Sequence, residues 1–278
     1  MDRGRRAAYG RRLRGALVVP ALLGCAEADA ISLDEERALG EDLAGQVAMR
    51  LPLVRDSAAA AFVRQLGRGL AARIDSTGRQ YEFVLVDSRV VNAFAIPGGF
   101  IFINRGIVER ASNASELAGV VAHEIGHVVA RHSVEALQRE RSANTLLGLV
   151  YLLLQRQPSE GEQLAVQVVG GAWMARHSRE DEREADRLAL RVLTRAGLDP
   201  RGLPGFFSTL LAEERAQSPL VLQWFSTHPL TAERVAAADT LIATLPDDTL
   251  DRLRADLPEF QRVRERLLAL PPPPEPVQ

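Results

Sequence analysis

The segment "VVAHEIGHVVARH", residues 120–132, carries three of the five histidines in the chain. His123 and His127 are four residues apart, so on a helix they lie on one face and can hold one metal ion. Glu124 lies one step round the helix, where it can reach a water molecule at the metal without binding the metal itself. This HExxH pattern predicts a zinc site with Glu124 as the general base.

A catalytic zinc ion also needs a third protein ligand and one open position. The segment "SREDEREADRLAL", residues 178–190, offers Glu182 and Asp186, which are again four residues apart on one helix face. One of these carboxylates can bind the metal while the other orients a ligand imidazole through its free N–H group. Without the HExxH motif, a stretch so rich in charge would be interpreted as a solvated helix surface.

The elements that must position these residues are mostly helices. Residues 115–141 predict one uninterrupted helix, with Ser115 or Asn113 as its N-cap. Residues 160–197 predict one long helix or two, ending at Gly197 as the C-cap. Further helices are predicted at residues 33–51 and 56–73, and two or three more after residue 197.

The region between residues 81 and 104 predicts β-structure. Residues 81–88 alternate and are rich in strand-forming residues, and "VVNAFAIPGGFIFIN", residues 90–104, is a hairpin broken at "PGG". The fold expected is mostly helical α+β, with a small antiparallel sheet beside the HExxH helix. The apolar residues 144–155 are too few to cross a bilayer, which favours a buried or hairpin helix over a membrane contact or a lid.

The first 24 residues hold six arginines followed by the apolar run Ala16–Gly24, which is the layout of a secretory signal peptide. The sequence "LLGC" that follows resembles the lipobox of bacterial lipoproteins. That resemblance implies a lipidated Cys25, a periplasmic protein and an anchor in the outer membrane. Residues 25–33 would be a tether, residues 34–269 the catalytic domain, and residues 270–278 a disordered proline-rich tail.

Composition also bears on disulfide bonds and on nucleic-acid binding. A single cysteine cannot form an intrachain disulfide. A formal net charge of −2 gives no indication of a nucleic-acid partner.

The motifs together resemble a known family. "HEIGH" followed by "SREDEREAD" is similar to the paired HExxH and ExxxD motifs of metallopeptidase family forty-eight. "NAFAIPGGFIFINRGIV", residues 92–108, is similar to the family's strand pair beside the cleft, and "STHPLTAER", residues 226–234, to a segment near its metal. The resemblance extends over residues 35–245 and implies a zincin-like metalloprotease domain with one zinc ion per chain.

The resemblance also implies roles for individual residues. Glu124 would be the base and Asp186 would hold a ligand histidine, while the zinc ligands would be His123, His127 and Glu182. His228 and Arg234 would approach the site from a later segment and stabilise the oxyanion. His228 has a second interpretation, in which it occupies the open position of the zinc and keeps the enzyme latent. His132 and His177 match no ligand position and are interpreted as ordinary surface or packing residues.

The substrate expected is an extended polypeptide. It would pair through main-chain hydrogen bonds with an edge strand formed by Asn92, Ala93, Phe94 and Ala95. Such pairing favours unfolded or misassembled envelope proteins, so we expect a zinc metalloendopeptidase of periplasmic protein quality control that can meet the outer-membrane assembly machinery. One alternative is a chaperone or binding module that does not cut, which the intact Glu124 argues against. A purely structural zinc site is the other, although such sites usually use cysteine ligands.

Overall fold

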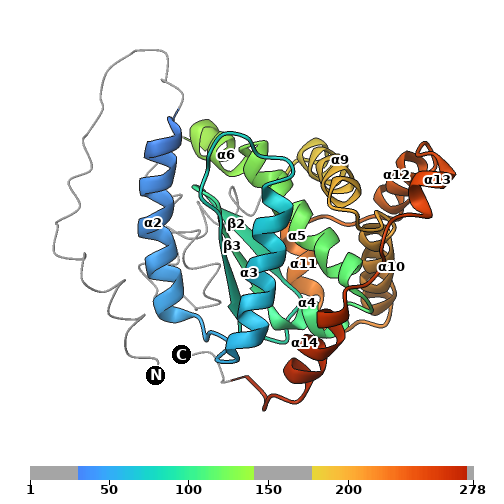
Figure 1. Cartoon of the computed structure of the whole chain (residues 1–278). Helices are drawn as coiled ribbons and strands as arrows, with labels where there is room; N and C mark the ends of the chain where they lie inside the picture. Colours follow the sequence, from blue (N-terminus) through green and yellow to red (C-terminus); the bar gives the residue numbers. More distant parts are fainter. Residues whose placement is uncertain (1–30, 141–176, 274–278) are drawn as a thin grey trace.

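The computed structural model describes residues 31–140 and 177–273 (Figure 1). Several predictions from the sequence lie outside these ranges and stay predictions. They concern the signal peptide, the lipidated Cys25, most of the tether, the apolar stretch 144–155, the first part of the helix or helices predicted over residues 160–197 and the last residues of the tail.

A small mixed sheet of three strands forms the centre of the N-terminal half. The strands are β1 (Glu82–Val86), β2 (Ala93–Ile96) and β3 (Phe100–Asn104), in the spatial order β1-β3-β2. The predicted hairpin is confirmed, because β2 runs antiparallel to β3 with Phe94 opposite Phe102. The prediction of a wholly antiparallel sheet is wrong, because β3 lies between the other two strands and runs parallel to β1. The tight turn after β2 contains Gly98 and Gly99, whose φ angles of 81° and 89° suit glycine.

The two faces of the sheet are covered by different helices (Figure 1). Helix α2 (Leu33–Arg50) packs Leu43 and Val47 against Phe94 and Phe102 on one face. Helix α3 (Ser57–Ala71) and the helix that carries HExxH cover the other. Side chains on successive strand residues point to opposite faces, so a sheet covered on both faces needs a continuous apolar run, as in β3, whose five residues are all buried.

Among the helices that the structure describes, the one that carries HExxH is the most buried. After the short α4 (Arg105–Arg110), helix α5 (Ala114–Val129) begins at Asn113, whose side chain accepts a hydrogen bond from the Glu116 N–H. The prediction of one helix over residues 115–141 is wrong. Helix α5 ends at Val129 and a second helix, α6 (His132–Glu140), begins after Arg131, whose φ of 60° breaks the helical path.

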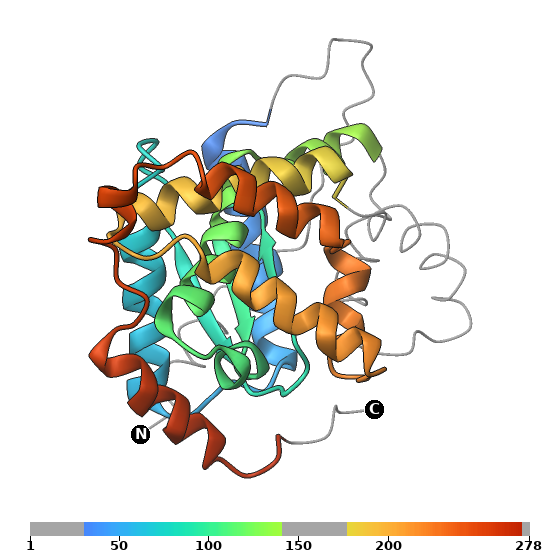
Figure 2. The ribbon, with the colours of Figure 1, turned by 90° about the vertical axis from the view of Figure 1, so that its right-hand side faces the viewer.

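Helix α9 (Arg179–Arg195) lies beside α5, and Gly126 of α5 faces Ala185 of α9. It starts with a capping box between Ser178 and Asp181 and ends before Gly197, whose φ of 72° confirms the predicted C-cap region. Figure 2 shows α9 among the C-terminal helices.

Five helices follow α9 within the described residues, rather than two or three. They are α10 (Gly202–Arg215), α11 (Leu222–Thr227), α12 (Ala232–Ile242), α13 (Asp247–Leu250) and α14 (Pro258–Leu268). Helices α11 and α13 have six and four residues, which is too short for a helical hydrophobic period to be recognised in the sequence. No helix in the described ranges is both long and apolar enough to cross a membrane.

Candidate metal centre

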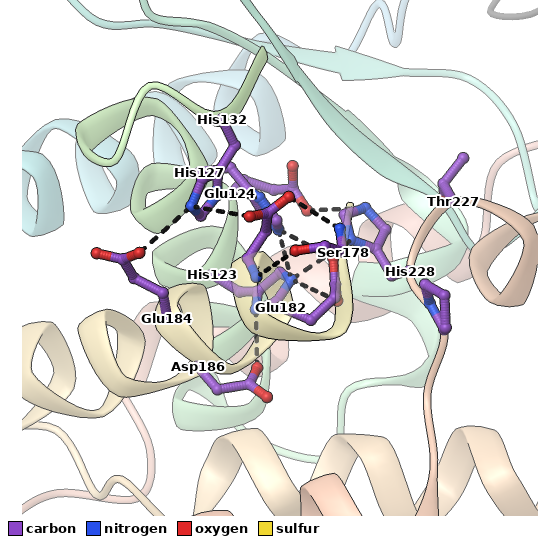
Figure 3. A network of polar contacts seen from close by, with 12 residues as sticks. His123, Glu124, His127, His132, Ser178, Glu182, Glu184, Asp186, Thr227 and His228 are labelled. Carbon is purple, nitrogen blue, oxygen red and sulfur yellow. Dashed lines mark hydrogen bonds and ion pairs between the residues drawn. The ribbon is translucent and has the colours of Figure 1, made fainter. Parts of the chain in front are cut away.

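Two helices bring the predicted ligands together in the interior of the protein (Figure 3). His123 and His127 from α5 point their Nε2 atoms toward each other, 3.0 Å apart. Glu182 from α9 places Oε1 3.3 Å from His127 Nε2 and Oε2 3.5 Å from His123 Nε2. All three side chains are buried. The spacing of four residues between the two histidines of α5, and the position of Glu182 on α9, therefore bring these three donors together.

A fourth donor comes from the residue that ends α11. His228 Nδ1 lies 3.1 Å from Glu182 Oε1 and 3.4 Å from His123 Nε2. The imidazole stacks on Trp224, with ring centroids 4.7 Å apart. One ligand atom from each of the four residues can be chosen so that all lie within 4.8 Å of one another.

This donor set fits a divalent metal ion. Imidazole nitrogens and a carboxylate oxygen that converge away from water are the ligands of zinc and similar ions. The two Nε2 atoms at 3.0 Å bring lone pairs together, and a cation between them would relieve that repulsion. The residues present can therefore hold a metal.

Asp186 and Arg234 contact the predicted ligands His123 and Glu182 and hold them in place. Asp186 Oδ1 lies 2.9 Å from His123 Nδ1, which fixes the imidazole with Nε2 toward the centre. Arg234 donates to both oxygens of Asp186 at 2.8 Å, and its Nη1 lies 2.5 Å from Glu182 Oε2. The guanidinium thus ties two carboxylates of α9 together, and its predicted role at the oxyanion stays a prediction.

Glu124 faces the edge strand. The main chain of Ala95 favours the ionised form of the buried Glu124 carboxylate, whose Oε1 lies 3.4 Å from His228 Nε2. Asn104 N–H donates to Asn92 C=O, so alternate residues of β2 bond to β3 while the main chain of Ala95 points the other way. In the part of the chain that the structure describes, no strand pairs with the outer edge of β2, and the predicted base lies beside that edge.

The buried charges shift several pKa values. Burial raises the pKa of Glu124. Burial also opposes ionisation of Glu182, but the positive charge of His228 and hydrogen bonds from neighbouring histidines hold its pKa well below the usual value. For His123, burial works against protonation, yet hydrogen bonds to Asp186 and Glu182 raise its pKa to about 9. In the metal-free protein, the proton on His123 therefore supplies part of the positive charge that a metal ion would bring.

Two histidines near the centre were missed from the sequence. His132 is 3% exposed, and its Nδ1 lies 2.9 Å from His127 Nδ1, so it is no surface residue, and the interpretation as a packing residue stays a prediction. The half-buried His177 places its ring centroid 3.8 Å from that of His127. On a continuous helix, residue 132 would lie about 140° round from residue 127, and only the turn at Arg131 brings it back.

Comparison with known proteins adds two kinds of relative. Over 224 residues the chain is 32% identical to the beta-barrel assembly-enhancing protease of Escherichia coli strain K12, which covers 78% of this chain and 45% of that protein. It is 26% identical over 242 residues to the mitochondrial metalloendopeptidase OMA1 of Schizosaccharomyces pombe, covering 84% of this chain and 70% of that protein. The mitochondrial metalloendopeptidase OMA1 of Bos taurus is 30% identical over 169 residues, covering 57% and 32%. The chain thus spans less than half the length of the beta-barrel assembly-enhancing protease.

The sequence model described as peptidase family M48 matches residues 57–242. This range includes both helices that carry the buried donors, the edge strand and the segment with His228 and Arg234. The match covers more than half of the chain, so this chain belongs to peptidase family M48.

Proposed function

We propose that this protein is a zinc metalloendopeptidase that hydrolyses extended polypeptides. The observation that carries the proposal is the buried convergence of His123, His127 and Glu182 next to the carboxylate of Glu124. Two imidazoles, one carboxylate and one further position match the requirements of a catalytic zinc. When bound, the ion would polarise a peptide carbonyl and lower the pKa of a water molecule.

Glu124 would move the proton. Its carboxylate would take a proton from the attacking water and pass it to the nitrogen of the leaving amine. Burial raises the pKa of Glu124, which brings its affinity for a proton closer to that needed at neutral pH.

The substrate would bind as an added strand. The main-chain groups of Ala93 and Ala95 point away from β3, because these residues alternate with those that bond to it. A polypeptide paired there would be held by its backbone, with little selection among side chains. Asn92 and Phe94 are also predicted for the substrate-binding strand. Their main-chain groups face β3, so they would hold the strand in the sheet rather than bond to the substrate.

Such a substrate must be locally unfolded, which supports a role in protein quality control. A periplasmic setting rests on the signal-peptide pattern and the predicted lipid anchor at Cys25. An envelope substrate and contact with outer-membrane assembly machinery are further supported by the similarity to a beta-barrel assembly-enhancing protease. These parts of the proposal describe where the peptidase would work rather than its chemistry.

The alternative is a latent or non-cutting protein that binds outer-membrane proteins with the same metal fold. His228 favours a latent state, because its Nδ1 belongs to the donor set and would fill the position that water needs. The intact Glu124 favours a peptidase, since a purely binding protein needs no base. We therefore propose a peptidase whose resting state is held back by His228.

Replacing the base tests the chemistry. Glu124→Gln should bind zinc as the unchanged protein does but cleave casein at least ~100-fold more slowly, because it cannot accept the proton. Casein turnover and zinc content are measured on the same samples. Glu180→Gln is the matched control, since Glu180 is an exposed carboxylate of α9. Casein turnover at the unchanged rate in Glu124→Gln would refute the mechanism.

A further inference from the structure

We propose that His132 is a positioning residue for the metal ligand His127. The inference rests on the proposed metal site and assigns a function to a side chain outside the donor set. His127 Nε2 faces the centre, while its Nδ1 lies 2.9 Å from His132 Nδ1 (Figure 3). Both imidazoles are buried.

The chemistry of the two rings fixes the direction of this hydrogen bond. A neutral histidine that binds a metal through Nε2 carries its proton on Nδ1. His127 Nδ1–H is then the donor, and His132 Nδ1 must be the acceptor. The remaining proton of a neutral His132 is therefore on Nε2.

Carboxylates of α9 favour this tautomer of His132. Its Nε2 lies 3.6 Å from Glu184 Oε2 and 4.0 Å from Asp181 Oδ1. These distances exceed those of a direct hydrogen bond, so the effect is electrostatic attraction of the Nε2–H toward negative charge. The Nδ1 lone pair of His132 is thereby kept free for His127.

The two ligand imidazoles of α5 are thus held in the same manner by different groups. His123 Nδ1 lies 2.9 Å from a carboxylate oxygen of Asp186, and His127 Nδ1 lies 2.9 Å from His132 Nδ1. A partner on the far nitrogen fixes the ring orientation and the tautomer of a metal-binding histidine. Asp186 follows from the family motif, whereas His132 follows only from the geometry.

A network of ion pairs and hydrogen bonds stabilises the turn that orients His132. Arg131 has a φ of 60°, an unfavourable value for a residue with a side chain. Its Nε donates to buried Glu36 of α2 at 3.0 Å, and its Nη2 donates to the Ile31 carbonyl. Arg79 also bonds Glu36, at 2.6 Å. This network holds the turn that returns His132 to the centre.

A second metal ion is the competing arrangement, because His127, His132 and His177 also offer closely spaced nitrogens. If it bound His127 through Nδ1, that nitrogen would have to lose its proton while Nε2 binds the first ion, whereas a hydrogen bond to His132 keeps the proton in place. The tautomer argument therefore favours a hydrogen bond, and metal stoichiometry separates the two arrangements.

The experiment compares three substitutions in the full chain. His132→Leu removes the acceptor, and His132→Asn keeps an acceptor oxygen near the position of Nδ1. Val134→Ala is the matched control, because Val134 is a buried residue of α6 that is no part of the donor clusters. Zinc affinity is measured by competition with a chromophoric chelator, and the ligand field by the visible spectrum of the cobalt(II)-loaded protein. Thermal unfolding of the metal-free proteins reports folding separately.

His132→Leu should weaken zinc binding by about 10- to 100-fold and shift the cobalt spectrum. His132→Asn should restore most of the affinity, and Val134→Ala should leave both readouts unchanged. The proposal is overturned if His132→Leu binds zinc as tightly as the unchanged protein, if it loses no more than Val134→Ala, or if His132→Asn gives no recovery. A second zinc ion per chain that depends on His132 would overturn it as well. An unchanged protein that binds no zinc would instead refute the metal site, and the inference with it.

Discussion

At the scale of single residues, His228 is the side chain that contacts both the ligands and the predicted base. It touches the predicted ligand Glu182 through Nδ1 and the predicted base Glu124 through Nε2. A side chain placed between base and ligands can either stabilise an oxyanion or compete with water for the metal. Its Nδ1, within reach of the other three donors, favours competition.

Removing that imidazole distinguishes the two roles. His228→Ala should increase casein cleavage, because the position for water is then free. Steady-state cleavage rates with equal zinc content provide the measurement. If His228 is instead a donor to the oxyanion, the same substitution should slow cleavage by about 100-fold. A slower enzyme would thus contradict the latent state without affecting the peptidase assignment.

At the scale of elements, the closeness of α5 and α9 determines whether the ligands can meet. Gly126 lies between the two HExxH histidines, and a Cβ atom there would come within 3.0 Å of the Cα and carbonyl oxygen of Ala185. Ala185 is next to Asp186 and three residues after Glu182. The missing side chain at Gly126 therefore allows α9 to bring its carboxylates to the histidines.

Gly126→Ala should destabilise the protein by about 1–3 kcal/mol, because the added methyl group overpacks the contact between the helices. Urea unfolding of the metal-free protein measures the change. Gly69→Ala is the matched control, since a Cβ at Gly69 of α3 meets nothing within 4 Å. That change should stabilise by about 0.5–1 kcal/mol through helix propensity. Changes of the same sign in both variants would contradict this account of the α5–α9 contact.

At the scale of the whole molecule, the centre couples metal binding to stability and pH. Segments far apart in sequence, from α5, α9 and the end of α11, enclose groups that are charged or partly protonated without the metal. A metal that binds only the folded state stabilises it by mass action. Proton and metal compete at His123, so the stabilisation by metal must depend on pH.

The gap in melting temperature between zinc-loaded and metal-free protein should widen from pH 6.5 to 9. In the metal-free protein the pKa of His123 is raised from 6.5 to about 9. That protonation contributes stability below pH 6.5, and the contribution is lost as the pH rises through 9. Zinc replaces the proton, and its apparent affinity rises about tenfold per pH unit over this window.

Thermal unfolding at a fixed free zinc concentration, with and without a chelator, measures this gap. In Asp186→Asn, His123 loses a carboxylate that raises its pKa, so the widening should shrink. A gap independent of pH in the unchanged protein would show that no proton is displaced from His123.

Much of the fold and site followed from local patterns. The predicted hairpin, the helices predicted over residues 33–51 and 56–73 and the cap at Asn113 are confirmed. The sequence failed where a single residue departs from the pattern, as at Arg131, or where elements are very short, as in α11 and α13. It also did not reveal that β3 would lie between β1 and β2, because strand order depends on packing against helices that are distant in the chain.

The sequence by itself determined which residues share a helix face, because the 3.6-residue period is a local property of the backbone. That was sufficient to pair His123 with His127 and Glu182 with Asp186. Only the tertiary structure decided that the two faces meet, that Arg234 ties the carboxylates together, and that His132 turns back to His127. These contacts depend on how closely α5 and α9 pack and on one left-handed residue held by a buried ion pair, and neither is encoded by a local repeat.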